Sequence, residues 1–88
     1  MNATTLESGM FFRSMESKRL IPLVGCKLAV NFIVDPDHIF TGRLKTFDNY
    51  KNFTLINVED HLYKDSYPER VFRGDQVLYM KHICRLRY

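Results

Sequence analysis

Residues 42–59 read GRLKTFDNYKNFTLINVE, and this stretch decides the fold. Apolar and polar residues alternate on both sides of its centre, as they do in strands with one buried face. At the centre, Phe47 is followed by the polar run DNYKN (residues 48–52), which is rich in residue types that favour turns. The stretch therefore predicts two strands, 38–46 and 53–59, joined by a polar loop that contains an aromatic ring.

The alternation continues upstream and downstream of this pair. Residues 27–32 read KLAVNF, which places their apolar side chains on one face of a strand, and the turn Asp35-Pro36-Asp37 follows. Further along, 70–73 and 76–83 are expected to be short strands around the turn Gly74-Asp75. Five short strands of this kind predict a mainly β fold that bends into a small barrel, because an open flat sheet of this size would leave its apolar face unprotected.

Two details of the strands carry expectations of their own. Gly42 lies inside a strand, where a missing side chain typically allows a bend or a close approach of another backbone. In the strand 53–59, we expect Phe53, Leu55 and Asn57 to share one face. The polar segment 60–69, which contains Pro68, is expected to be a loop.

The first twenty residues have a different pattern. Thr4 and Glu7 form a possible capping box, and Phe11 and Met15 follow at helical spacing. We therefore expect a short amphipathic helix over about 6–19, whose apolar side covers one open end of the core. Pro22 is expected to end it, since proline disfavours helical geometry in the residue before it.

Composition limits the classes of protein to consider. The chain has 88 residues, of which 45% are hydrophobic, enough for a single domain over 1–88 with one core. Thirteen basic against ten acidic residues give a charge of +3, which is compatible with a polyanionic partner but does not require one. The apolar run 20–30 contains proline, glycine and lysine and is too short to span a membrane. Cys26 and Cys84 have no metal-type spacing, so we expect a reduced, non-secreted protein.

Two motifs resemble those of the Sm and Sm-like (LSm) family. Residues 42–59 resemble the first Sm motif. In this chain the motif positions are Gly42, Leu44, Asp48, Asn52 and the closing Glu59. Residues 71–77, VFRGDQV, resemble the second, whose centre is a basic residue, glycine and a small polar residue. The resemblance covers nearly all of residues 10–83, and the pieces MFF, LVG and Tyr67-Pro68 are similar to the subunit-two type of the Sm-like ring.

The resemblance implies the Sm fold, a short N-terminal α-helix followed by a strongly bent five-stranded antiparallel sheet that forms a small open, SH3-like barrel. It divides the single domain into a helix about 6–19, a first motif about 27–59, a variable loop 60–69 and a second motif about 70–83. It also implies a heteroheptameric ring, in which subunits pair through the edges of their fourth and fifth strands.

The function implied by the resemblance is binding of uridine-rich single-stranded RNA, without catalysis. The expected binding residues are Tyr50, Asn52, Arg73 and Gly74, with Asp48 as loop support. The Tyr50 ring can stack on a base, and the Asn52 amide can both donate to and accept from uracil. The Arg73 guanidinium can stack or contact phosphate, and Gly74 lets the backbone approach closely. Because Tyr50 and Asn52 are two residues apart, extended geometry would point them the same way.

Simpler interpretations apply to several of these residues. A polar run such as DNYKN is often only a loop, and Arg73-Gly74-Asp75 is also an integrin-type tripeptide, for which a tight turn is the better account. The scattered histidines are expected at the surface, and Glu59 and Asp60 are expected to be solvated. No catalytic constellation, metal site, cofactor or small-molecule substrate is expected.

The sequence leaves two hypotheses. The first is an RNA-binding subunit of a ribonucleoprotein that acts in pre-mRNA splicing, in the spliceosome, or in mRNA decay, in the nucleus, the cytoplasm or both. The second is an Sm-fold protein-interaction subunit without direct RNA contact. The second rests on two departures from the family pattern, a longer turn at 35–37 and Lys51 at a position that is usually apolar. The basic segment 81–88 fits either a solvated strand end or a path for RNA.

Overall fold

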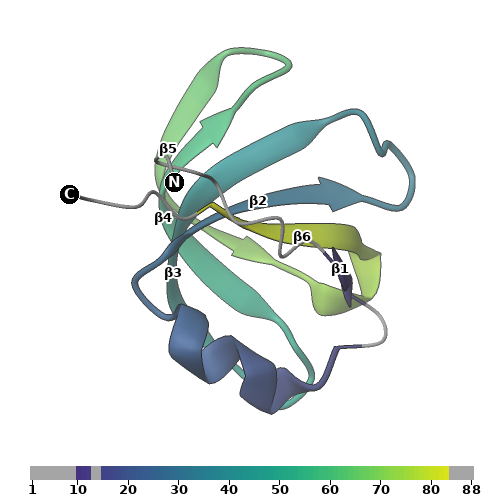
Figure 1. Cartoon of the computed structure of the whole chain (residues 1–88). Coiled ribbons are helices and arrows are strands. Elements are labelled where there is room, and N and C mark those ends of the chain that lie inside the picture. Colours follow the sequence, from purple (N-terminus) through teal and green to yellow (C-terminus); the bar gives the residue numbers. More distant parts are fainter. Residues whose placement is uncertain (1–9, 13–14, 84–88) are drawn as a thin grey trace, which may run out of the picture.

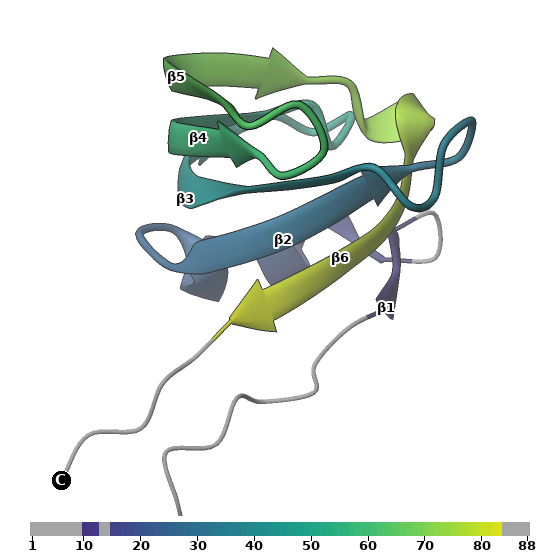
Figure 2. The same ribbon diagram turned by 90° about the horizontal axis from the view of Figure 1, so that it is seen from above.

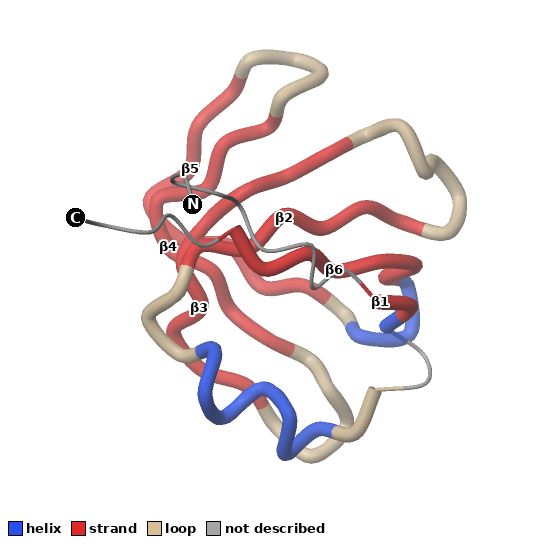
Figure 3. Tube along the Cα trace, in the orientation of Figure 1, coloured by secondary structure: helices blue, strands red, loops and turns tan. Residues whose placement is uncertain are grey.

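Six strands form one antiparallel sheet in the computed structural model, which describes residues 10–12 and 15–83. Their order across the sheet is β1-β6-β2-β3-β4-β5. The strands are β1 (Met10–Phe11), β2 (Lys27–Phe32), β3 (Ile39–Phe47), β4 (Phe53–Asp60), β5 (Asp65–Phe72) and β6 (Val77–Ile83). Figure 1 shows the strong curvature of the sheet, and Figure 2 shows the five long strands following one another across it. The mainly β fold is therefore confirmed (Figure 3).

The N-terminal helix differs from its prediction in position and type. Much of the range 6–19 lies outside the described residues, but residues 10–11 form β1, which pairs with Met80 and Tyr79 of β6. Within the described part of the N-terminal region, the helix η2 (Ser17–Leu23) is of the 3-10 type and contains Pro22 rather than ending before it. Buried Leu20 anchors this segment, so tertiary packing outweighs the helical spacing of the sequence.

Side chains from the N-terminal segment and all five long strands meet in one core. Met15 is buried there, as expected, whereas the side chain of Phe11 lies outside the described set. The stacked rings of Phe53 and Phe72, 5.3 Å apart, join β4 to β5 at the centre. The core consists of Phe12, Met15, Leu20, Leu28, Val30, Phe40, Leu44, Phe53, Leu55, Val58, Phe72, Val77 and Met80.

A bulge in β4 shows that the predicted common face of Phe53, Leu55 and Asn57 is wrong at Asn57. Asn57 has a φ of 53° and is exposed, while Val58 is fully buried. The β3–β4 register shifts between Thr41 and Arg43, because β4 contains one more residue than β3 there. Gly42 lies within this shift, and a Cβ on it would be 3.0 Å from the Ile56 carbonyl oxygen, which confirms the expected close approach.

The predicted loop over 60–69 is wrong. Only residues 61–64 lie between the strands, and β5 begins at Asp65, five residues earlier than expected. Pro68 is accommodated because β5 is an edge strand of the described sheet, where a missing N–H costs no ladder bond. Lys64, with a φ of 62°, completes the tight turn.

Candidate functional site

The loop after β3 is closed by its own backbone and by one carboxylate. The Asp48 N–H donates to the Asn52 carbonyl at 2.9 Å, and the Lys51 N–H donates to the Asp48 carbonyl at 3.1 Å. Asp48 Oδ1 accepts from the N–H groups of Tyr50 (2.8 Å) and Asn52 (3.0 Å), and Oδ2 accepts from Asn52 Nδ2 at 3.1 Å. A single side chain thus holds the two residues of the loop that are expected to contact RNA.

The same hydrogen bonds set the protonation of Asp48. Desolvation of the carboxylate acts to raise its pKa, but the Asn52 side chain and the N–H groups of Tyr50 and Asn52 together outweigh it. The pKa of Asp48 therefore lies below its ordinary value of 3.8. The carboxylate is accordingly ionised at neutral pH and remains an acceptor for the whole loop.

Asn52 connects this loop to the turn after β5. Its Oδ1 accepts a hydrogen bond from the Gly74 N–H at 3.1 Å. Gly74 is buried at the start of η3 (Gly74–Gln76), and a Cβ there would be only 2.5 Å from the Lys51 carbonyl oxygen. The Asn52 amide has one N–H and one oxygen lone pair beyond those used in these two bonds. Donor and acceptor capacity of the kind that matches uracil thus remains at a fixed position.

The extended geometry expected between Tyr50 and Asn52 is not found. Lys51 between them has a φ of 68°, so the backbone is not extended there. Tyr50 is 82% exposed and lines a hollow of about 240 Å³ together with Lys51, Gly74, Asp75 and Val77. The ring is therefore available for stacking beside the turn, while Asn52 ties the two loops together.

In the described part of the chain, Arg73 makes no hydrogen bond or ion pair with the loop 48–52, whereas Gly74 does. It is exposed, its guanidinium donates to Asp75 at 3.0 Å, and it is not among the residues that line the hollow. An ion pair this exposed is weak, so the side chain can exchange Asp75 for another acceptor.

Lys51, which fits the family pattern poorly, makes long-range contacts that sequence reasoning missed. Its Nζ donates to the carbonyl oxygens of Met15 at 2.8 Å and Phe12 at 3.1 Å, and lies 5.3 Å from the Phe12 ring centroid. The only sequence signal was its presence at a usually apolar position of the motif.

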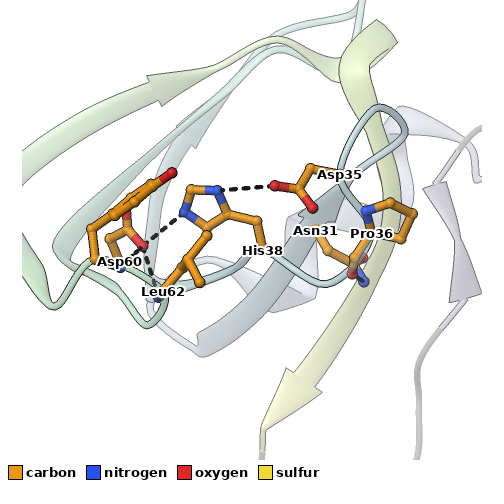
Figure 4. Close-up of polar contacts among 7 residues, drawn as sticks. Asn31, Asp35, Pro36, His38, Asp60 and Leu62 are labelled. Carbon is orange, nitrogen blue, oxygen red and sulfur yellow. Dashed lines mark hydrogen bonds and ion pairs between the residues drawn. The ribbon is translucent and has the colours of Figure 1, made fainter.

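A second polar cluster corrects the expectations for His38 and Asp60. Asp60 is buried, and its Oδ1 contacts His38 Nε2 at 2.7 Å and accepts from the Leu62 N–H (Figure 4). The same oxygen accepts from the Tyr63 N–H at 3.1 Å. His38 is mostly buried, stacks on Phe40 and faces Asp35 at 3.7 Å. The cluster ties the turn 61–64 to the start of β3, so its residues stabilise the fold rather than being solvated.

No group of three His, Cys, Asp or Glu side chains within residues 10–12 and 15–83 is arranged to hold a metal ion. In the same part of the chain, no helix combines the length and apolar character needed to cross a membrane.

Solved archaeal structures share this architecture, although no protein-family model and no curated protein matches the chain. An SmAP (LSm) protein from Methanococcus vannielii is 28% identical with a TM-score of 0.65, over 73% of this chain and 89% of that one. The chain has the Sm fold.

Two further Sm-fold structures agree. A heptameric archaeal Sm protein is 25% identical with a TM-score of 0.63, over 75% of this chain and 97% of that one. The Sm protein of Pyrococcus abyssii, solved in complex with a uridine heptamer, is 24% identical with a TM-score of 0.64, over 74% and 93%. The similarity to the Pyrococcus abyssii protein supports the same fold.

Proposed function

We propose that this chain is an Sm or Sm-like protein, of the subunit-two type, that binds uridine-rich single-stranded RNA as part of a heteroheptameric ring. The observation that carries the proposal is the hydrogen bond from Gly74 to Asn52, which joins the two Sm-motif loops beside the exposed ring of Tyr50.

The chemistry of the loops favours RNA over a small molecule. An exposed aromatic ring offers a stacking surface that any base can use, worth about 1–3 kcal/mol per base. Asn52 is held by Asp48 and Gly74 with hydrogen-bonding capacity left over, and Arg73 adds a mobile positive charge. The hollow of about 240 Å³ is lined by Tyr50, Lys51, Gly74, Asp75 and Val77, so it lies on the same two loops, beside the exposed ring of Tyr50. We therefore assign Tyr50 to stacking, Asn52 to the uracil edge and Arg73 to phosphate or a second base face.

The sheet edges support assembly into a ring. Beyond β5 the described residues place no further strand, and Val71 on this edge is 66% exposed. Among the described residues, β1 covers the outer edge of β6 at two residues, Met80 and Tyr79. Pairing β5 of one chain with β6 of the next is a head-to-tail contact that can close into a ring. One Sm-fold neighbour is heptameric, and we propose seven subunits here.

We propose a non-enzymatic role in pre-mRNA splicing, as part of a small nuclear ribonucleoprotein, or in mRNA decay, in the nucleus, the cytoplasm or both. The alternative, a protein-interaction subunit without RNA contact, gains no support from Lys51, because its amine faces the N-terminal segment and leaves the Tyr50 ring exposed.

Binding of fluorescent oligouridine to the purified assembly tests the proposal. Asn52→Ala and Arg73→Ala are compared with Lys64→Ala, an exposed lysine in the turn 61–64. We expect both site variants to weaken binding and the control to leave it unchanged. Arg73→Ala should also reduce the slope of log affinity against log salt by about 0.7 if Arg73 contacts one phosphate. Unchanged affinity in both site variants would reject the site.

A further inference from the structure

Lys51 bridges the proposed RNA-binding loop and a segment almost forty residues earlier in the chain. Its amine donates to the carbonyl oxygens of Phe12 and Met15, which lie 39 and 36 residues away. Phe12 and Met15 are both buried. The Lys51 amine also lies over the Phe12 ring, 5.3 Å from its centroid, where the ring face attracts a cation.

The backbone of the same residue forms part of the site. Lys51 has a left-handed φ of 68°, a conformation that costs free energy for a residue with a side chain and persists only where its surroundings hold it. Its carbonyl group lies directly against Gly74, and it precedes Asn52. Lys51 therefore has its side chain fixed to the N-terminal segment and its backbone between the two loops of the site.

We propose that Lys51 is a positioning residue, which keeps Asn52 in register with Gly74 by fastening the Asn52 loop to the carbonyl groups of Phe12 and Met15. Lys51 also lines the hollow beside Tyr50, but its amine is directed to protein carbonyls, so we assign its effect to these neighbours and not to contact with RNA. An apolar side chain of similar length can fill the same space but cannot donate to the two carbonyls. The expected effect on RNA binding rests on the proposed function. The contact of Lys51 with Phe12 and Met15 can be tested without RNA.

The test compares Lys51→Met with Lys64→Met and Lys51→Arg. Lys64 is a matched control, because it is a lysine with a similar left-handed φ of 62° in a different loop. Amide hydrogen exchange without RNA should be faster at Asn52 and Gly74 in Lys51→Met, unchanged in Lys64→Met, and close to wild type in Lys51→Arg, whose guanidinium can still donate.

Oligouridine binding supplies the second readout. Lys51→Met should bind about tenfold more weakly, which corresponds to about 1.4 kcal/mol, with an unchanged slope of log affinity against log salt. A slope reduced by one phosphate contact would overturn the proposal in favour of direct RNA contact, and unchanged exchange at Asn52 and Gly74 would also overturn it. If wild type bound no oligouridine, the proposed function would fail, whereas the exchange data would still decide whether Lys51 fastens the loop.

Discussion

Asn52 Oδ1 accepts a hydrogen bond from the Gly74 N–H at 3.1 Å, across 22 residues of sequence. Each end of this bond is supported from elsewhere. Asp48 holds the Asn52 amide, and the Lys51 carbonyl packs against Gly74. The two motif loops therefore form one unit, and changes to any of these residues should be felt at the others.

Replacing Gly74 by alanine should disturb both loops. The new Cβ would lie 2.5 Å from the Lys51 carbonyl oxygen and 2.8 Å from its carbon, which are backbone atoms that cannot rotate away. We expect a loss of about 1–3 kcal/mol in the free energy of unfolding, as overpacking typically causes. Urea denaturation measures it, with the exposed neighbour Asp75→Ala as the control. Equal stability of Gly74→Ala and wild type would show that the loops are not packed as described.

Asp48→Asn should change how stability depends on pH. Because hydrogen bonds lower the pKa of Asp48 below 3.8 in the folded state, its carboxylate stabilises the fold above pH 3.8. This contribution is lost as the pH falls through the folded-state pKa. Wild type should therefore exceed Asp48→Asn most at neutral pH, and the difference should shrink in denaturant titrations below pH 3.8. A difference that stays constant from pH 7 to pH 2 would contradict the stated role of the carboxylate.

Tyr50 should matter for RNA and not for folding. Its side chain is 82% exposed, so Tyr50→Ala should leave thermal unfolding nearly unchanged. Loss of a stacking ring should weaken oligouridine binding by about 1–3 kcal/mol, whereas Tyr50→Phe keeps the ring and should bind nearly as wild type. Fluorescence anisotropy distinguishes the pair, and equal weakening by alanine and phenylalanine would assign the effect to the hydroxyl instead.

Asp60 should stabilise the turn 61–64 and the start of β3. Its Oδ1 accepts from Leu62, Tyr63 and His38, so Asp60→Ala leaves two backbone N–H groups without this acceptor. Asp60→Asn retains an oxygen at that position and should be destabilised less. Comparing both variants with wild type by thermal unfolding gives the order, and an alanine variant as stable as wild type would mean that the cluster contributes little.

Strand β1 should compete with a neighbouring subunit for the outer edge of β6. Phe11 pairs with Tyr79, and opposed residues of antiparallel strands are about 4.5–5.5 Å apart at Cα, within the range of a disulfide. We expect Phe11→Cys/Tyr79→Cys, with Cys26 and Cys84 changed to serine, to stay monomeric when it is oxidised and mixed with the other subunits of the ring.

Analytical ultracentrifugation before and after reduction checks this prediction, and each sample is its own control. Reduction should restore assembly, because two residues of strand pairing are readily displaced by a longer edge strand. Rings that form equally well with the disulfide closed would exclude pairing at this part of β6.

Alternation of apolar residues was sufficient to predict that the five long strands exist, and to assign Leu28, Val30, Phe53 and Leu55 to buried faces, because burial of one face requires that period. It could not predict the reversal at Asn57, where a single residue with positive φ turns the rest of β4 over. Nor could it place the start of β5. The Asp60 side chain closes the turn within four residues, and the polar residues that follow remain in an edge strand where they are exposed.

The site residues were found through motif spacing, which brings residue types together but does not describe their contacts. The motif suggested Asn52 and Gly74, and the bond between them became visible only in the folded chain. Lys51 was the residue that the pattern explained least. Its partners, Phe12 and Met15, are too distant in sequence for any local rule to identify them.

The central claim is that RNA meets this chain at the Asp48–Asn52 loop. The most direct measurement is photo-crosslinking of a 4-thiouridine oligonucleotide to the assembly purified with this chain, followed by mass spectrometric mapping of the crosslinked residue. We predict crosslinks at Tyr50, reduced in Asn52→Ala and unaffected in Lys64→Ala. Crosslinks to this chain that map to β5 or η2, with none at the 48–52 loop, would contradict the account.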